Sequence, residues 1–408
     1  MDCFIPAGDK KKCTGCGLCV QKCPRKCIQM QRDEEGFFYP EVNVNMAQCV
    51  QCGLCEKACQ SLIGSSMYHS RSEAFFCMVS NERHELLQSS SGGVFSLIAK
   101  GFIQQGGYVC GCVYDKTMRA VHILTDREEE LCKMRGSKYV QSSLDDVYSA
   151  IREALHNNRK VLFTGTGCQV AAVRAFVGEH LKDNLYTMEI LCHGVPSPGF
   201  FEQYVQYLER KHQGKVVDIQ FRNKEKDGWG SEHKTCIILQ DKNGGITKIR
   251  PMLPSYFSAF FYGMNLRESC YACNYARGER VADLTLGDFW GAWKKYGADF
   301  HDGISVVAVN SEKGHQLCRG IEKKASHFER LQEKEAMHGN GNFYAPVVRP
   351  VDRNTFYRDK ESGGYAKVWK RVYLSKTYRK KVIKSIYGAI VPKKLRMIRQ
   401  SLRMKINR

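Results

Sequence analysis

A short stretch near the amino end decides the fold of this chain: CTGCGLCVQKCP, residues 13–24. Two residues separate each of the first three cysteines, three precede the fourth, and a proline follows it. Three thiolates spaced this tightly can wrap three corners of an iron–sulphur cubane, while a more distant cysteine closes the cluster. Residues 49–60, CVQCGLCEKACQ, repeat the spacing with Gln60 in the place of the proline. The two runs therefore predict two four-iron clusters.

Paired runs of this kind are typical of a bacterial ferredoxin, in which the fourth cysteine of each run ligates the cluster of the other. Zinc prefers two separated cysteine pairs around one tetrahedral ion, and this arrangement does not offer them. The predicted metal ligands form a first set, Cys13, Cys16, Cys19 and Cys59, and a second set, Cys49, Cys52, Cys55 and Cys23.

Composition places the chain among ordinary globular proteins. Its 408 residues are 43% hydrophobic, enough for two or three domains. The amino end has no apolar run that would serve as a signal sequence, and no stretch reaches the roughly 18 apolar residues of a membrane-spanning helix. We therefore expect a cytoplasmic protein, in which the 20 cysteines favour metal ligation over disulfides.

Beyond residue 66 the pattern changes to alternating strands and helices. The strand at 160–164 runs through Gly165, Thr166 and Gly167 into a helix at 170–177, which is typical of a parallel α/β unit. Helices are also expected at 94–103 and 145–156. Strands are expected at 74–79, 108–114, 120–124, 186–191, 216–221, 236–240, 246–250, 281–286 and 305–309.

These elements predict an α+β or mixed α/β fold. A two-cluster ferredoxin module (1–65) precedes a larger mixed-sheet redox domain of flavin-binding type, in an amino-terminal part (66–158) and a carboxyl-terminal part (159–345). A basic helical tail (346–408) follows.

Four further cysteines form a third set, Cys168, Cys192, Cys270 and Cys273. Cys168 and Cys192 each follow a predicted strand, so both thiols are expected at the carboxyl edge of a parallel sheet, where α/β folds place their sites. Cys270 and Cys273 have the spacing of a two-ligand loop. The third set predicts a third four-iron cluster; the alternatives are a structural zinc ion, or buried thiols beside a cysteine turn. No ligand spacing is found for Cys3, Cys27, Cys77, Cys110, Cys112, Cys132, Cys236 and Cys318, which are expected to be core or surface thiols.

Several motifs in one order resemble the beta-subunit family of F420-reducing hydrogenases and formate dehydrogenases, which includes 7-hydroxymethyl chlorophyll a reductase. Gly167 stands where relatives commonly have proline. Besides the two cysteine runs, the motifs are SSSGG (89–93), RGSKY (135–139), GTGCQ (165–169), CHGVPSP (192–198), FR (221–222) with Trp229, CYAC (270–273), AD (282–283) and GD (287–288).

The resemblance implies a flavin, usually FAD, beside the clusters. The local pattern at 91–93 could cap a helix and present amides to a pyrophosphate, although a plain helix cap has the same pattern. Lys138 could face a phosphate or a flavin anion, or be a solvated surface lysine. Arg222 and Trp229 could face substrate or pack in the interior. The residues assigned to the flavin are Ser90, Ser91, Gly92, Gly93, Ser137, Lys138, Tyr139, Gly165 and Thr166.

Together these features predict an iron–sulphur flavoprotein oxidoreductase. Electrons would pass from a ferredoxin-like or other soluble donor through the clusters to the flavin and on to a small organic substrate. The alternative is a non-catalytic electron-transfer subunit that serves a larger partner enzyme. The sequence identifies no catalytic residue and no substrate, and it leaves open whether coenzyme F420 is used.

The net charge of +20 is concentrated in a tail. Residues 362–408 hold fifteen Lys and Arg and no Asp or Glu, which leaves +5 for the rest of the chain and disfavours a nucleic-acid-binding protein. Apolar residues at helical spacing in 378–391 and 395–406 predict basic amphipathic helices. Such helices favour peripheral association of residues 370–408 with the inner face of the membrane; nucleic acid binding and packing on the chain's own domain are the alternatives.

Overall fold

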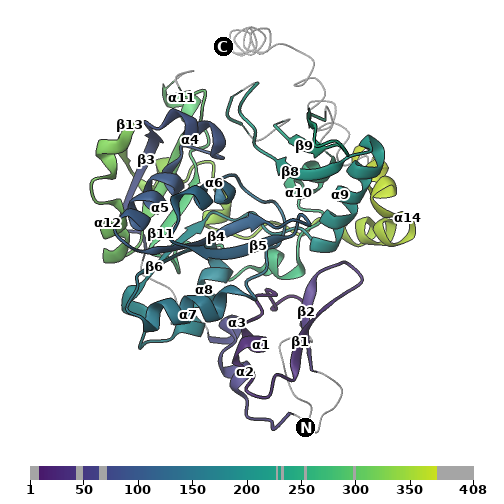
Figure 1. Cartoon of the computed structure of the whole chain (residues 1–408), viewed down its shortest axis with the longest axis horizontal. Helices are drawn as coiled ribbons and strands as arrows, with labels where there is room; N and C mark the ends of the chain where they lie inside the picture. The colour runs from purple at the N-terminus through teal and green to yellow at the C-terminus, as the bar shows by residue number, and fades with distance from the viewer. Residues whose placement is uncertain are drawn as a thin grey trace.

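The computed structural model describes residues 9–42, 49–63, 71–226, 228–230, 234–251, 255–296 and 300–374. An eight-stranded mixed sheet lies at the centre, in the order β13-β3-β12-β11-β7-β6-β4-β5 (Figure 1). Its strands are β3 (Ala74–Ser80), β4 (Tyr108–Tyr114), β5 (Ala120–Thr125), β6 (Val161–Thr166), β7 (Leu185–Ile190), β11 (Leu284–Asp288), β12 (Ser305–Val309) and β13 (Ala325–Leu331).

The middle of this sheet is parallel. β4, β6, β7 and β11 run in one direction, and the other strands pair antiparallel at the two sides. Every residue of β12 is buried, as expected for a strand covered on both faces. Because parallel strands end together, the carboxyl ends of β6, β7 and β11 meet at one edge of the sheet. The predicted mixed α/β fold is confirmed.

Helices cover both faces of the sheet. Neighbouring residues of a strand point to opposite faces, so Cys77 and Met78 of β3 lie in different apolar clusters. One face packs against α5 (Val94–Gln104), α6 (Leu131–Met134) and α12 (Glu312–Cys318). The other face packs against α7 (Val147–His156) and α8 (Gly167–Val177) at one half and α11 (Ala292–Tyr296) and α13 (Glu333–Ala336) at the other. α4 (Arg83–Gln88) follows β3.

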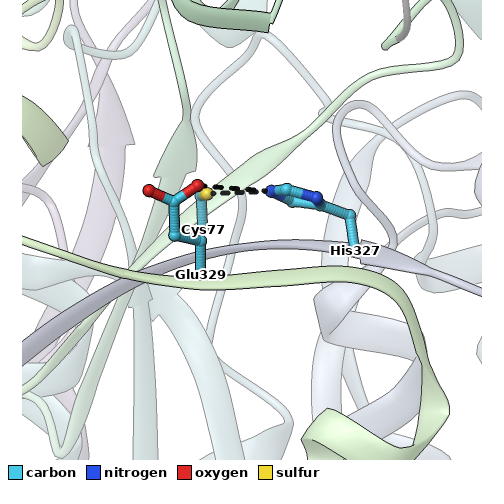
Figure 2. A group of neighbouring side chains, drawn as sticks. All are labelled: Cys77, His327 and Glu329. Atoms are coloured by element: carbon cyan, nitrogen blue, oxygen red, sulfur yellow. Dashed lines mark hydrogen bonds and ion pairs between the residues drawn. The ribbon is translucent and has the colours of Figure 1, made fainter.

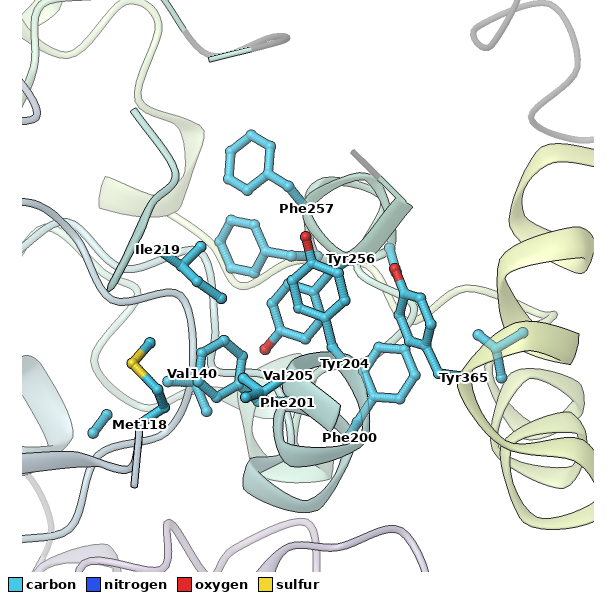
Figure 3. Close-up of a cluster of buried hydrophobic side chains, with 14 of the residues drawn as sticks. Met118, Val140, Phe200, Phe201, Tyr204, Val205, Ile219, Tyr256, Phe257 and Tyr365 are labelled. Carbon is cyan, nitrogen blue, oxygen red and sulfur yellow. The ribbon is translucent and has the colours of Figure 1, made fainter. Parts of the chain in front are cut away.

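A second, three-stranded sheet packs on an aromatic core that also includes residues of the amino-terminal module and of the large sheet. β8 (Lys215–Gln220), β9 (Cys236–Gln240) and β10 (Ile246–Ile249) are joined by α9 (Pro198–His212), α10 (Ser255–Phe261) and α14 (Arg353–Leu374). Figure 3 shows the rings between these helices: Tyr256 stacks on Tyr204 with centroids 4.9 Å apart, and Tyr365 of α14 lies 5.0 Å from Tyr204. α14 is kinked at Gly364, whose φ is 59°. Residues 353–368 of the predicted tail are therefore part of the core.

The amino-terminal module has the internal repeat that its sequence predicts. Its elements are α1 (Leu18–Lys22), β1 (Ile28–Arg32), β2 (Phe38–Val42), α2 (Leu54–Lys57) and α3 (Gln60–Ile63). α1 and α2 each begin after a glycine in the left-handed region, Gly17 with φ 74° and Gly53 with φ 68°. A side chain would be strained at both positions, so the glycines turn each cysteine loop into its helix.

The module packs directly on the larger domain, beneath α7 and α8 in Figure 1. Gly36, in the β1–β2 connection, lies against Gly199 of α9 so closely that a Cβ on either would lie 2.8 Å from the Cα of the other. On the same connection, Glu35 is held by both terminal nitrogens of Arg353, each at 2.7 Å. The module is thus a fixed part of one body.

No helix among the described residues is long and apolar enough to cross a membrane. The predicted amphipathic helices at 378–391 and 395–406 lie outside the described residues, so the membrane association of residues 370–408 stays a prediction. Short 3-10 turns at Glu128–Glu130, Lys182–Asn184, Glu268–Ala272, Ile321–Lys324 and Gly341–Phe343 complete the described structure.

Candidate metal centres

The structure brings the first cysteine set together from both runs. Burial, together with the neighbouring sulphurs of Cys13 and Cys59, raises the pKa of the Cys16 thiol to about 11. Burial also raises the pKa of Cys19, again with contributions from the other three. Cys59 comes from the second run, so the exchange of the fourth cysteine that the sequence predicts is present in the geometry.

The cysteines of the second set also lie close together, nearer the surface of the protein. Burial raises the pKa of Cys55, and Cys23 and Cys52 add to the increase. Cys27 is buried, with its sulphur 3.4 Å from that of Cys23. Cys52 is exposed, so this set is the one open to solvent.

The third set forms where β6 and β7 end. Cys168 is the second residue of α8, which continues β6, and Cys192 follows β7 after one residue. Cys270 lies in a 3-10 turn and Cys273 directly follows it. Burial raises the pKa of Cys192 well above its ordinary value, and Cys270, Cys168 and Cys273 raise it further. The pair Cys168 and Cys192 therefore lies close to the pair Cys270 and Cys273.

Hydrogen bonds to sulphur show what the third set is suited to hold. The backbone N–H of Gly194 donates to Cys192 Sγ at 3.3 Å, and that of Tyr275 donates to Cys273 Sγ at 3.4 Å. Amides aimed at ligand sulphurs stabilise thiolates and tune the potential of an iron–sulphur cluster. Four cysteines with such donors fit a four-iron cluster, and the chain offers four cysteines at each of the three places.

A buried arginine beside the first set was not found from the sequence. Arg267 is fully buried, its Nε donates to the carbonyl of Cys13 at 2.8 Å, and a terminal nitrogen donates to Cys13 Sγ at 3.6 Å. Among the described residues no carboxylate lies within ion-pair distance of it. A buried guanidinium needs a negative charge nearby. The net negative charge of a cluster on four thiolates would supply it, so Arg267 fits an occupied first set.

The first and third sets lie next to each other. After burial, the causes that raise the pKa of Cys168 are Cys273 and Cys270 of its own set and Cys16 of the first set. Tyr148 of α7 donates its hydroxyl to the carbonyl of Cys16 at 2.9 Å and packs in the same apolar cluster as Cys168. The two sets therefore share one buried space.

The residues assigned to the flavin meet only in part. Ser90 Oγ accepts hydrogen bonds from the backbone N–H and the hydroxyl of Ser137 at 2.8 and 3.0 Å, so two predicted motifs touch. The N–H of Gly92, however, donates to Ser305 Oγ at 2.8 Å, and a Cβ at Gly92 would lie 2.2 Å from the carbonyl oxygen of Met78. Close packing on β3 therefore explains the glycine at 92, whose amide is engaged within the chain.

Other predicted flavin contacts also have partners within the chain. Ser91 donates to the carbonyl of Ile304 at 2.7 Å, and α5 begins after Gly93 without a side-chain cap. The predicted capping role of Ser91 is therefore wrong. Thr166, another residue assigned to the flavin, caps a different helix, α8.

The RGSKY motif is likewise engaged in packing and backbone contacts. Lys138 donates to the carbonyls of Lys133 and Arg135 at 2.6 and 2.8 Å, closing the turn after α6. Tyr139 packs against Phe260 at 4.6 Å. Lys138 and Tyr139 are thus engaged within the chain.

At the end of β11, Asp288 organises a polar group near the same sheet edge. Arg222 binds it with two nitrogens at 2.6 and 3.0 Å, and Trp229 Nε1 donates to it at 3.0 Å. Trp290 stacks on Trp229 at 5.1 Å and lines a cavity of about 410 Å³. Arg222 and Trp229 are therefore engaged in packing around Asp288. The cavity is also lined by Phe289, Gly291, Lys295, Gln332, Lys334, Glu335 and His338.

Two protein families match this chain. Residues 158–334 match the carboxyl-terminal region of the beta subunit of coenzyme F420 hydrogenase/dehydrogenase, and residues 12–63 match the 4Fe-4S dicluster domain. The first range contains all four cysteines of the third set, and the second contains all eight of the first two sets.

Individual known proteins are similar to the same two regions of this chain. The coenzyme F420-dependent sulfite reductase of Methanocaldococcus jannaschii is 22% identical over 371 residues, covering 88% of this chain and 54% of that protein. The NADH-quinone oxidoreductase subunit I 2 of Geobacter metallireducens is 42% identical over 53 residues, covering 12% and 40%. The chain thus spans about half the length of these relatives or less. A chain of the F420-reducing [NiFe] hydrogenase complex from Methanosarcina barkeri aligns with a TM-score of 0.43 and 17% identity, covering 77% of this chain and 95% of that one.

Proposed function

Because this chain belongs, through residues 158–334, to the coenzyme F420 hydrogenase/dehydrogenase beta-subunit family, we propose that it is an iron–sulphur oxidoreductase. Its amino-terminal module would accept electrons from a soluble donor, and its larger domain would deliver them to a small organic substrate. Bound clusters supply one-electron transfer over a wide range of potentials. We assign the three cysteine sets as the ligands of these clusters.

One observation carries this proposal: the first and third sets share a buried space. Cys16 raises the pKa of Cys168 although the two thiols come from different domains. Gln60, which replaces the proline of the second run, is buried; its side chain donates to Thr14 Oγ1 at 2.7 Å and accepts from the hydroxyl of Tyr275. The chain thus holds both sets in a fixed relation and in buried surroundings, as electron transfer over a short distance requires.

The second set has the properties of an entry point for electrons. Cys52 is exposed, and the neighbouring Val50 and Leu54 expose 59% and 45% of their surface. An apolar rim around an exposed ligand suits brief contact with a ferredoxin-like partner.

The flavin stays part of the proposal on the strength of the family resemblance. Since the Gly92 amide and the Ser91 hydroxyl are engaged within the chain, we assign no step to the flavin. The matching family and one relative are named for coenzyme F420, and that relative is a sulfite reductase. This coenzyme and sulfite therefore belong among the first compounds to assay.

Metal content tests the assignment of ligands. From four-iron stoichiometry, anaerobically purified protein should hold about twelve irons and twelve sulphides per chain. Cys270→Ala should lower both to about eight, because it removes one ligand of the third set. Cys236→Ala, which removes a buried thiol outside the three sets, should retain the full content. Equal iron in wild type and Cys270→Ala would contradict the third cluster.

Turnover separates the two functional classes. An enzyme should reduce a small acceptor when the isolated chain is supplied with reduced ferredoxin or reduced F420. A non-catalytic subunit should take up electrons from the donor, seen as bleaching of the cluster absorbance, and pass them only to a partner protein. Bound flavin, measured after acid release, tests that cofactor separately.

A further inference from the structure

Three side chains of metal-ligating type meet at the edge of the large sheet, and none of them belongs to the three cysteine sets. β13 pairs antiparallel with β3, and Glu329 is directly opposite Cys77 in the register. His327 is two residues before Glu329, so both side chains point to the same face as the thiol. Figure 2 shows the three side chains converging from the two strands.

Two of the distances between the three donor atoms are close to the edges of a metal-centred tetrahedron. Cys77 Sγ lies 3.7 Å from His327 Nε2, and this nitrogen lies 3.9 Å from Glu329 Oε2. All three atoms lie within 4.8 Å of one another. Zinc bonds of about 2.3 Å to sulphur and 2.0–2.1 Å to nitrogen or oxygen give ligand separations of roughly 3.3–3.6 Å. The two separations from His327 Nε2 exceed these values by about half an ångström or less.

The surroundings support the carboxylate in a ligand position. Tyr296 of α11 donates its hydroxyl to Glu329 Oε2 at 2.5 Å, and Lys295 binds the other oxygen of the same carboxylate. Ligating carboxylates are generally fixed by such hydrogen bonds from outside the coordination shell. The tyrosine oxygen also lies 3.6 Å from Cys77 Sγ.

Burial divides the site into a closed and an open side. Cys77 is fully buried in an apolar cluster, whereas the His327 and Glu329 side chains are 26% and 36% exposed. An ion can therefore reach the donors from solvent while its thiolate bond stays protected. One thiolate, one imidazole and one carboxylate form a donor set that zinc accepts and that hard cations such as magnesium do not.

We propose that Cys77, His327 and Glu329 bind one zinc ion, with water as the fourth ligand. The ion ties the edge strand β13 to β3 and to the end of α11. The site is separate from the electron path, since no residue of the three cysteine sets contributes to it.

Zinc content of the full chain, purified without oxygen and with its iron retained, tests the site. Wild-type protein should contain about one zinc per chain, and Cys77→Ser and His327→Gln should each lower it more than about tenfold, because a three-ligand site does not survive loss of one ligand. Cys318→Ser removes a half-buried thiol elsewhere and should retain the zinc. His327→Gln keeps the test valid if Cys77→Ser fails to fold, because that side chain is partly exposed.

X-ray absorption at the zinc edge distinguishes this site from zinc that has entered an empty cluster site. The proposed site predicts one sulphur at about 2.3 Å and the remaining ligands nitrogen or oxygen at about 2.0–2.1 Å. A shell of four sulphurs, zinc content unchanged in His327→Gln, or protein free of zinc after growth in zinc-supplemented medium would each overturn the proposal.

Discussion

At the scale of single residues, Arg267 places a buried positive charge beside Cys13, a predicted cluster ligand. Its buried positive charge beside Cys13 stabilises the reduced, more negative state of a cluster held by the first set. Arg267→Gln should therefore make the midpoint potential of that cluster more negative by at least about 60 mV, a tenfold change in a one-electron equilibrium. Potentiometric titration followed by electron paramagnetic resonance measures the shift.

The charge-conserving variant separates electrostatics from packing. Arg267→Lys loses the contact with the carbonyl of Phe38 at 3.0 Å but keeps a cation near Cys13. It should hold the potential closer to that of wild type than Arg267→Gln does. Equal shifts in both variants would show that Arg267 acts only by packing.

No local pattern could have predicted this role of Arg267. Its partners lie 254 and 229 positions away in the chain, so only the folded structure brings them together. The cysteines are different, because the geometry of a cubane imposes a spacing that is visible in the sequence. The packing at Gly92 was hidden from the sequence for a related reason: the Met78 carbonyl that leaves no room for a Cβ there lies on another strand, which a local cap pattern cannot reveal.

At the scale of elements, the start of α8 positions a predicted ligand. Thr166 and Gln169 form a capping box, with the N–H of Thr166 donating to Gln169 Oε1 at 3.0 Å. Thr166 Oγ1 also lies 3.1 Å from Cys168 Sγ. Thr166→Ala should lower the free energy of unfolding by about 1 kcal/mol, whereas Thr166→Ser should keep most of it. Anaerobic thermal melting measures the difference; equal melting temperatures for the two variants would contradict the cap.

Strands with continuous apolar runs were the most predictable elements. β4, β9 and β12 begin and end at the predicted residues, because their apolar runs are bounded by polar turns. β13 was missed: its sequence, ASHFERL, mixes charged and apolar residues because it lies at the sheet edge and is half exposed. α9 was also missed, although Ser197 accepts a cap hydrogen bond from the N–H of Phe200.

At the scale of the whole molecule, Arg353 connects helix α14 to the amino-terminal module. It is almost fully buried and binds Glu35 of the module at 2.7 Å and Glu268 at 2.8 Å. Arg353→Met would leave both carboxylates without this partner, which should cost about 3 kcal/mol of stability. The neighbouring Arg349→Met removes a partly exposed ion pair to Glu268 and should cost less than about 1 kcal/mol.

Anaerobic melting temperatures and limited proteolysis of the β1–β2 connection measure both effects. Arg353→Met should melt at a lower temperature and be cleaved faster in this connection than Arg349→Met. Similar behaviour of the two variants would show that the buried pair does not hold the module in place.

The contact between Gly36 and Gly199 has a consequence for how such a protein can be rebuilt. The two backbones are in contact there with no room for even a methyl group. The interface therefore cannot accommodate a module whose surface has a different shape. A free-standing ferredoxin fused in place of residues 9–63 would carry its cofactors but would sit at another angle. The distance between its clusters and the third set would then be longer. Such a chimaera would fold but would transfer electrons slowly.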